Sequence, residues 1–290
     1  MRSNALIVLT LRIAAAVLVT APASAQIRVR NGGVPSPAAP QLTETLSFTQ
    51  TANLDDVRAI TKFAWSHDGK TGFEVELPIV WRDATFRGTS DDGGGLGDAV
   101  LRVQRSLRQD DGVLTSTRWA LFGDVRLPTG DDTALEGRVR ALPKLLQPGM
   151  GSYGVGAGGV CTVIRDRHRF SAALSGRWNA EADDFQMGKE IHAGLSYWYR
   201  LRPAVFGADR HLTEVRPVLE ALLNHRFESE RGGNGTGDDG AVVWLAPGLQ
   251  VYPSRDLLVQ ASVALPIVNE IDDVLGRREW SALLALRWYF

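Results

Sequence analysis

Hydrophobic and polar residues alternate along most of this chain, most regularly in two segments. In residues 73–82 one face is apolar, and the other carries two glutamates and an arginine. The final residues 280–290 also alternate, with Trp280, Trp288 and Phe290 on the same apolar face. A repeat of two residues predicts β-strands with one apolar face. A strand of about 9–11 residues can cross a bilayer when it is tilted.

Twelve segments of this kind are predicted between residue 41 and the C-terminus. They span residues 42–50, 57–66, 73–82, 98–108, 113–127, 151–164, 169–179, 189–201, 213–227, 241–251, 256–267 and 278–290. Short connections alternate with longer ones, of which 83–97 and 128–150 are the longest. Short turns at one end, long loops at the other and an even strand number are typical of outer-membrane barrels. We therefore predict an all-β fold, an antiparallel up-and-down transmembrane β-barrel with both termini in the periplasm.

The first 25 residues have the features of an export signal. Arg2 and Arg12 accompany a short apolar run, and Ala23-Ser24-Ala25 provides the small residues of a cleavage site. The run is too short for a transmembrane helix. We predict a signal peptide at 1–25, an irregular periplasmic segment at 26–40 and a barrel at 41–290. This organisation predicts residence in the bacterial outer membrane.

Composition narrows the functional classes. Without the two arginines of the signal, the chain has 30 basic and 33 acidic residues, so a nucleic-acid partner is not expected. The single Cys161 cannot form an internal disulfide and offers no metal cluster. A secreted β-sandwich would also alternate, but it would not need arginines on nearly every polar strand face. The membrane barrel is therefore the preferred interpretation.

Two short motifs and the C-terminus resemble a known family. Gly95-Leu96-Gly97-Asp98 opens one predicted strand, Val-Arg-Leu-Pro-Thr-Gly-Asp at 125–131 ends another, and a glycine-rich segment follows at 149–154. With the aromatic C-terminus, they resemble outer-membrane proteins named for the meta-cleavage pathway of phenol degradation. The resemblance spans roughly residues 41–290, which is most of the chain after the predicted signal peptide. It implies a transporter of hydrophobic or aromatic compounds, loosely similar to the long-chain fatty acid channels.

Two features limit what this resemblance implies. The fatty acid channels have an N-terminal plug segment, for which residues 26–40 are too short. Taken alone, the Leu-Pro-Thr-Gly-Asp motif is a strand end that runs into a turn, because proline suits an edge and glycine and aspartate suit tight backbone. The motifs therefore indicate the family more strongly than the solute.

Many charged residues lie on the polar strand faces, and they cannot face lipid, where a midplane arginine costs roughly 2–4 kcal/mol. We assign to the lumen Arg58, Lys62, Glu74, Glu76, Arg82, Arg102, Arg118, Asp124, Arg126, Arg177, Glu190, His192, Arg200, Glu214, Arg216, Glu220, Arg226 and Arg287. One interpretation is a lattice of ion pairs. Its expected pairings are Lys62 with Glu74 and Glu76, and Arg200 with Glu214, Arg216 and Glu220. The other, compatible interpretation is a charged pore wall that favours anions or cations.

Catalytic chemistry has little support. His192 and Ser196 share a face, yet a separation of four residues places them roughly 13 Å apart, too far for a nucleophile and its base. Glu74 and Glu76 lie about 6.6 Å apart, which suits paired-carboxylate hydrolysis, but their basic neighbours favour ion pairs. We expect no enzymatic activity and no catalytic cofactor.

A narrow point of the lumen is predicted near residue 150. Three glycines share the lumenal face of one strand, and glycines in strands often mark the close approach of another backbone. The preceding loop, 128–150, contains an unusually apolar stretch. We expect this loop to fold inward, whereas the alternative places it over the outer rim. The constriction would be formed by Leu142, Leu145 or Leu146 against Gly154, Gly156 and Gly158.

Asp-Asp pairs occur seven times, and six of them fall in predicted outer loops. Aspartate favours turns, so solvated turn residues are one interpretation. The other is that some pairs bind Ca²⁺ or Mg²⁺, hard cations that prefer carboxylate oxygens, and so bridge to lipopolysaccharide phosphates. The candidate ligands are Asp91, Asp92, Asp131, Asp132, Asp238 and Asp239.

The function predicted from these patterns is passive passage of a small solute, with hydrophobic or aromatic compounds as the expected class. The alternative is a structural or adhesive barrel with a closed lumen and functional outer loops. A count of twelve strands does not separate them, because about eight strands are filled by side chains and about sixteen leave a channel. The expected partners are membrane lipid, lipopolysaccharide, the solute and the assembly machinery that acts through the C-terminal strand.

Orientation is directly testable. Cysteines that replace Asp91, Asp131 and Asp238 should react with a membrane-impermeant thiol reagent on intact cells, because their loops are predicted to lie outside. Labelling that requires permeabilised cells would contradict the predicted topology.

Overall fold

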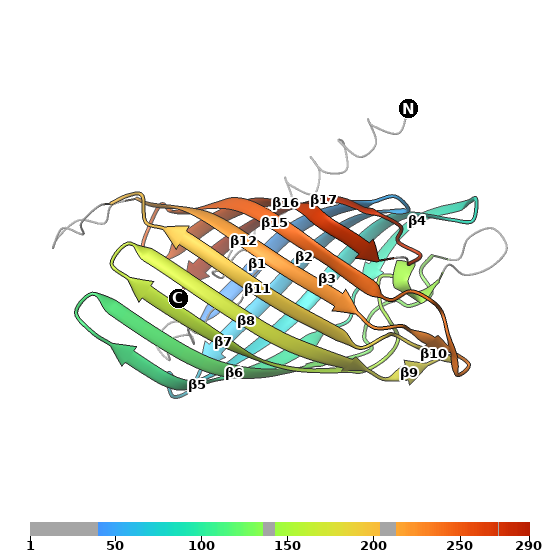
Figure 1. Cartoon of the computed structure of the whole chain (residues 1–290), viewed down its shortest axis with the longest axis horizontal. Helices are drawn as coiled ribbons and strands as arrows, with labels where there is room; N and C mark the ends of the chain where they lie inside the picture. Colours follow the sequence, from blue (N-terminus) through green and yellow to red (C-terminus); the bar gives the residue numbers. More distant parts are fainter. Residues whose placement is uncertain (1–39, 136–142, 204–212, 272) are drawn as a thin grey trace, which may run out of the picture.

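The structure, a computed structural model, describes residues 40–135, 143–203, 213–271 and 273–290. In these ranges the chain forms a closed antiparallel barrel of twelve strands (Figure 1). Around the barrel they are β1 (Gln41–Thr51), β2 (Leu54–Ser66), β3 (Thr71–Phe86), β5 (Val100–Asp111), β6 (Thr115–Arg126), β7 (Gly154–Arg165), β8 (His168–Asn179), β11 (Glu190–Tyr199), β12 (Glu214–Arg226), β15 (Gly240–Tyr252), β16 (Leu257–Ile271) and β17 (Arg278–Tyr289). No helix in the described residues has both the length and the apolar character needed to span a membrane.

Closure of the barrel depends on pairing between the first and last strands. β1 pairs with β2 on one side and with β17 on the other, from Gln41 opposite Tyr289 to Gln50 opposite Trp280. The amide of Phe290 extends this ladder by donating to the carbonyl of Pro40 at 3.2 Å. Hydrocarbon offers no partner for a free strand edge, so closure satisfies the backbone groups of a membrane-spanning sheet. The prediction of a twelve-stranded barrel is confirmed.

The two surfaces of the sheet are the reverse of those in a soluble protein. Leu77, Leu121 and Leu195 point outward with 53%, 53% and 63% of their surface exposed. Arg82 and Asp124 point inward and are buried. Exposed leucines over buried charges suit a barrel whose outer wall faces lipid.

Aromatic residues ring the outer wall near both ends. At the end with the short turns, here called the turn end, Trp65 stacks between Phe63 and Phe73 with ring centroids 5.3 and 5.5 Å apart. At the opposite loop end, Phe48 lies 4.9 Å from Trp280. Paired girdles of this kind mark the two interfaces of a transmembrane barrel.

The loop end contains more regular structure than expected. The segment 83–97 was predicted as a loop, and this was wrong: β3 continues into a hairpin with β4 (Thr89–Leu96). Arg87 and Gly88 form its tip with φ values of 51° and 78°, and two successive positive φ values favour a tight two-residue hairpin turn. Short strands β9 (Glu181–Ala182), β10 (Phe185–Gln186), β13 (Glu230–Arg231) and β14 (Asn234–Gly235) form a second small sheet at this end (Figure 1).

Residues 1–39, which include the predicted signal peptide, lie outside the described residues. The predicted signal peptide and the irregular segment therefore stay predictions. The described barrel begins with β1 at Gln41, and its last strand ends at Tyr289, followed by Phe290.

The last residue offers a test of barrel closure. Deleting Phe290 should lower the yield of folded barrel, because it removes an exposed aromatic group from the interface and the amide that binds Pro40. The fraction of protein with heat-modifiable migration on a gel measures this yield. Phe290→Tyr is the matched control and should assemble normally. A wild-type yield after the deletion would contradict the assigned role.

Candidate functional site

The interior of the barrel is the candidate site, and one wall of it is charged. Alternating burial along the strands places the predicted lumenal residues on the inward face, apart from Arg200, which follows β11. On the wall from β2 to β8 many of them form ion pairs. Arg102 lies between Glu74 and Asp124, and Arg177 donates to Asp124 at 2.8 Å from the other side. The predicted lattice is therefore present on this wall.

The individual pairings differ in part from those expected. Lys62 pairs with Glu76 at 2.6 Å, as predicted, whereas Glu74 forms an ion pair with Arg102. Glu214 pairs with Arg216 at 2.6 Å. Arg200 Nη2 lies 4.0 Å from Asp166 Oδ1. The residues Lys62, Glu74, Glu76, Arg102, Asp124 and Arg177 are called the ion-pair lattice below.

Glycines of β7 make the lattice continuous across a strand. Gly156 lies directly between Asp124 of β6 and Arg177 of β8, and a Cβ atom there would stand 2.8 Å from Asp124 Oδ1. Gly154 similarly lies between Arg126 and Asn179, whose side chains hydrogen bond at 3.0 Å. Glycine leaves the space over which side chains of the two flanking strands meet.

The expected contact between the loop leucines and these glycines is corrected by the structure. Leu146 is completely buried against Leu54 and Ala84 of β2 and β3. The Cβ position of Gly158 is approached by Phe122 and Ser175 instead. Leu146 packs on β2 and β3 because Leu54, Ala84 and Leu135 form an apolar cluster there. Leu142 lies outside the described residues.

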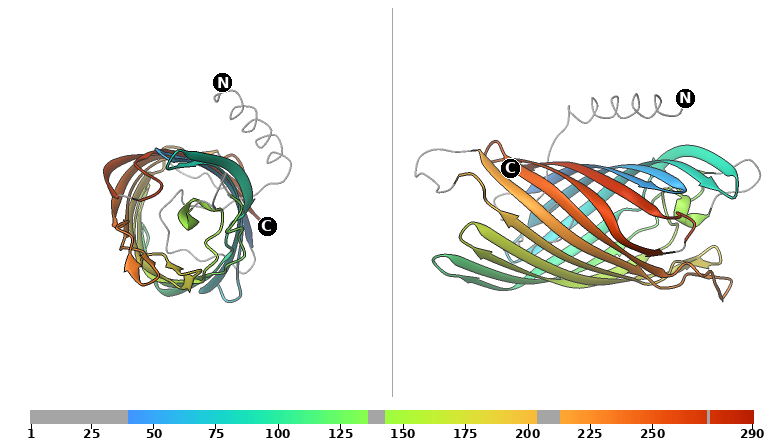
Figure 2. Two further views of the ribbon diagram at one scale, coloured as in Figure 1. Left: turned by 90° about the vertical axis from the view of Figure 1, so that its right-hand side faces the viewer. Right: turned by 45° about the horizontal axis from the view of Figure 1, so that its top comes forward.

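The loop nevertheless folds inward as predicted. Seen end-on, the short turn η1 (Lys144–Leu146) lies inside the ring of strands (Figure 2). Arg82 of β3, held by Asp56 at 2.6 Å, donates to the carbonyls of Leu145 and Gln147. A guanidinium is suited to this role because it presents several donors in a fixed plane. We call this set of contacts the Arg82 latch.

The sequence motifs of the resemblance meet at the base of the same loop. Asp98 accepts hydrogen bonds from the amides of Gly130 at 3.1 Å and Met150 at 2.9 Å. Asp131 accepts from the amide of Leu96 at 2.7 Å. The two motifs therefore tie the start and the end of the 128–150 loop to the barrel wall. Their role in the structure is to fix the loop, in agreement with the turn interpretation.

The Asp-Asp pairs are also engaged within the protein. Lys144 contacts Asp132 and lies 2.7 Å from Asp183. Asp238 accepts hydrogen bonds from the amide and hydroxyl of Ser229, each at 2.7 Å. In the described ranges no three histidine, cysteine, aspartate or glutamate side chains gather as a metal-binding group. Cation binding by Asp91, Asp92, Asp131, Asp132, Asp238 and Asp239 stays a prediction, and chelator-sensitive thermal stability in detergent would test it.

Asp273 shows how such a carboxylate organises the loops. It binds Arg278 at 2.7 Å and Arg226 at 2.9 Å. Burial raises the pKa of Asp273, but hydrogen bonding and charge from Arg278, with the charge of Arg226, bring it below its ordinary value. An ionised Asp273 therefore joins a loop to the end of β12.

An apolar wall faces the lattice, and sequence reasoning missed it. Trp244 and Val242 of β15 point inward and pack with Ala246, Ala264 and the half-buried Leu222. Nearer the turn end, Trp198 packs with Val218 and Leu283. The term apolar wall is used below for the side chains of these two clusters. They lie on β12, β15, β16 and β17, with Trp198 from β11. The alternation of residues along each of these strands would have assigned the same side chains to the inward face.

The candidate catalytic residues do not form a catalytic arrangement. His192 Nδ1 lies 3.0 Å from Asn224 Oδ1, and its Nε2 lies 3.8 Å from Glu190. Glu74 and Glu76 are occupied by Arg102 and Lys62. These side chains are therefore part of the polar contacts inside the barrel.

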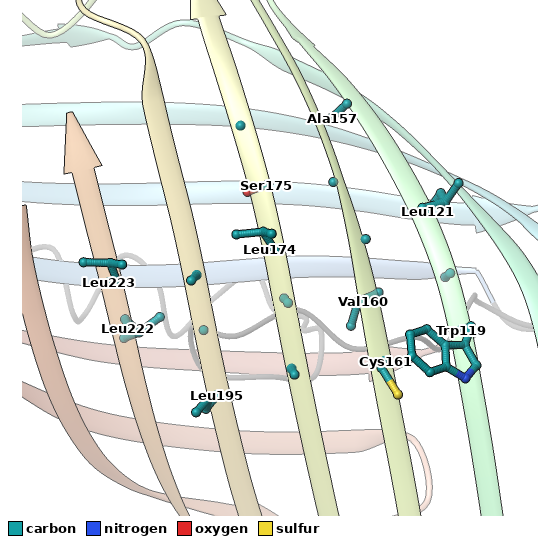
Figure 3. Close-up of a pocket in the computed structure, with 18 of the residues that line it drawn as sticks. Trp119, Leu121, Ala157, Val160, Cys161, Leu174, Ser175, Leu195, Leu222 and Leu223 are labelled. Atoms are coloured by element: carbon teal, nitrogen blue, oxygen red, sulfur yellow. The ribbon is translucent and has the colours of Figure 1, made fainter. Parts of the chain in front are cut away.

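One cavity lies among the loops, and a second hollow lies on the strands. At the loop end a cavity of about 900 Å³ lies among Phe86, Lys144, Leu145, Phe185 and neighbouring loop residues. On the wall of β6, β7, β8, β11 and β12 a shallow hollow of about 920 Å³ is lined by apolar side chains and small residues (Figure 3). Exposed residues such as Trp119 and Leu174 around it place this second hollow on the outer wall. The loop-end cavity, by contrast, lies among the loops.

A comparison with protein families assigns the chain. Residues 32–265 match the model of the family described as "Putative MetA-pathway of phenol degradation". The chain belongs to this family. The family assignment confirms the resemblance drawn from the motifs, and a search of curated proteins found no match.

Solved structures similar to this family member support the fold and the location. An outer membrane channel from Pseudomonas putida F1 has a TM-score of 0.69 at 12% identity, covering 91% of this chain and 100% of that one. The β domain of the Bordetella autotransporter BrkA has a TM-score of 0.50 at 15% identity, covering 88% and 100%. At this identity the likeness concerns the fold. The protein is a bacterial outer-membrane barrel.

The glycine gap of β7 generates a stability prediction. Gly156→Ala should lower the free energy of unfolding by about 1–3 kcal/mol, because the methyl group displaces Asp124 from Arg177. Gly123→Ala on β6 is the matched control, since its Cβ would meet the nearest atom at 3.6 Å. Urea titration in lipid vesicles measures both variants. If Gly156→Ala were as stable as Gly123→Ala, the gap at Gly156 would not be needed for the stability of the barrel.

Proposed function

We propose that the protein is a passive channel for a small solute that has an apolar or aromatic body. The observation that carries this proposal is that the ion-pair lattice lies on one side of the lumen and two clusters of inward apolar side chains lie on the other, where Glu220, Gln250 and Gln260 are also buried. The ion-pair lattice follows β2 to β8, and the apolar wall with Trp198 and Trp244 follows β11 to β17. A solute with one apolar and one polar side would find a matching surface on each side of the path.

The loop end provides the entrance in this proposal. The cavity of about 900 Å³ is lined in part by Pro143, Lys144 and Leu145 of the inward-folded loop. Leu145 lines this cavity, and Leu146 is fixed below it in the cluster with Leu54. The Arg82 latch therefore holds the loop where it would narrow the path.

Two further considerations support transport over catalysis. The similarity of fold to an outer membrane channel agrees with a conduit. The charged groups that could act as acid or base are bound to opposite charges, which lowers their capacity to exchange protons with a substrate. The description of the family points to phenolic compounds as the first solutes to test.

Conductance decides between the open channel and a closed structural barrel. Purified protein in planar bilayers should give discrete current steps, and vesicles that contain it should admit phenol faster than glucose. Current steps without selective entry of phenol would confirm a channel and contradict the proposed class of solute. The absence of both would favour the closed barrel with functional loops.

The latch can be tested separately. Arg82→Gln should increase single-channel conductance, because the carbonyls of Leu145 and Gln147 lose their donor while Asp56 keeps Arg58 at 2.5 Å. Arg105→Gln is the matched control, since Arg105 pairs with Asp68 at an exposed turn. Heat-modifiable migration verifies folding. An unchanged conductance for Arg82→Gln would place the loop outside the permeation path.

A further inference from the structure

The turn end of the lumen contains arginines in excess of carboxylates. Arg118, Arg169, Arg216 and Arg287 each lie within three residues of the turn end of their strand. Arg216 pairs with Glu214. In the described part of the chain, the ion pairs within 4.0 Å do not involve Arg118, Arg169 or Arg287. We call these four residues the arginine cluster.

The members of the cluster act on one another across the lumen. They come from β6, β8, β12 and β17, which are spread around the barrel (Figure 1). The charges that act on Arg169 include those of Arg118, Arg216 and Arg287. Arg287 itself is only 6% exposed. Like charges held together away from bulk water create a positive potential that attracts an anion.

Aromatic rings accompany the arginines. The guanidinium carbon of Arg216 lies 4.3 Å from the ring centroid of Trp198 and 4.4 Å from that of Tyr252. Arg169 lies 5.3 Å from the centroid of the same tryptophan. Stacking of this kind fixes the planes of the guanidinium groups and leaves their edges available as donors.

The hydrogen bonds of the cluster leave donors unused. Arg287 Nη1 donates to Tyr289 Oη at 2.7 Å, and Arg216 Nη1 donates to Tyr252 Oη at 3.1 Å. Arg169 Nε and Arg287 Nε are buried and have no hydrogen-bond partner in the described residues. Buried donors without acceptors are costly, and an acceptor supplied by a ligand would remove this cost.

The apolar wall leads to the same place. It runs from Trp244 and Leu222, in the half of the barrel nearer the loop end, to Trp198, Val218 and Leu283. Trp198 belongs to both the wall and the aromatic contacts of the cluster. The apolar wall therefore ends beside the arginines.

We propose that the arginine cluster binds the carboxylate of a small aromatic acid, which makes aromatic carboxylates the substrate class of the channel. The proposal rests on the proposed function and names its solute more narrowly. Arginine favours a carboxylate because its planar fork matches two oxygens at once. The aromatic ring of the ligand packs beside Leu283, the partly buried side chain of the cluster that also contains Trp198 and Val218.

Equilibrium binding tests the site without any need for conduction. Benzoate titrated calorimetrically into the folded protein in detergent should bind, whereas benzyl alcohol, which has the same ring and no charge, should bind at least about tenfold more weakly. The double variant Arg169→Gln, Arg287→Gln should weaken benzoate binding by about tenfold or more. Arg105→Gln, a charge change of the same kind on the exposed turn, should leave it unchanged.

The conservative variant distinguishes ligand contact from structural support. Arg169→Lys, Arg287→Lys keeps the charge but removes the fork, so it should retain part of the affinity for benzoate if charge attracts the ligand. Heat-modifiable migration confirms that each variant is folded. Benzoate binding that equals that of benzyl alcohol, or that is insensitive to both double variants, would falsify the proposal.

Ion selectivity separates failure of this proposal from failure of the channel. In a KCl gradient the wild type should show a reversal potential of the sign for anion preference, and Arg169→Gln, Arg287→Gln should move it toward cations. Benzoate binding without any conductance would refute the proposed function and retain the site. Anion preference without benzoate binding would overturn the aromatic carboxylate in favour of a simple anion.

Discussion

The interior of this barrel depends on one constraint, the closure of the sheet between β1 and β17. A closed sheet pairs its backbone groups within the lipid, and it also assigns every second side chain to an enclosed space. Charged residues on those positions cannot reach lipid or bulk water freely. Ion pairs such as Lys62 with Glu76, and hydrogen bonds such as Arg126 with Asn179, follow from that enclosure.

The glycines of β7 show how the absence of a side chain allows charged groups on neighbouring strands to meet. Without a side chain at Gly156, the carboxylate of Asp124 can be shared by Arg102 and Arg177 from opposite sides. A buried carboxylate with two guanidinium partners is far better compensated than one with a single partner. The glycine-rich strand β7 contributes no member of the lattice, but its glycine leaves the gap through which Asp124 and Arg177 meet.

Sequence patterns predicted the fold closely, because the side-chain period of two is imposed separately on every strand. The strand bounds differ from those expected by only a few residues at most ends, as for β12 at 214–226 against 213–227. The 83–97 segment was misjudged because its Asp-Asp and glycine residues resemble a loop, although Arg87 and Gly88 suffice to turn a hairpin. Pairings such as Glu74 with Arg102 depend on the register between strands, which alternation does not specify.

The inward loop and the apolar wall were predictable to different degrees. The apolar stretch near Leu146 indicated burial, but its partner wall depended on Leu54 and Ala84, which are distant in sequence. Trp198 and Trp244 could have been assigned inward from parity alone, yet tryptophan in a membrane barrel is first expected at the lipid interface. Trp244 is buried because neighbours with small side chains, such as Ala246 and Ala264, leave room for its ring.

The segregation of the two walls has a consequence for how such channels can diversify. Most of the apolar wall comes from residues 214–285, whereas the ion-pair lattice comes from residues 62–177. Each wall is thus encoded by an almost uninterrupted stretch of the gene. Recombination between related barrels near residue 200 would exchange one wall while the other, with its network of charges, is inherited whole. The two walls can therefore evolve as separate modules.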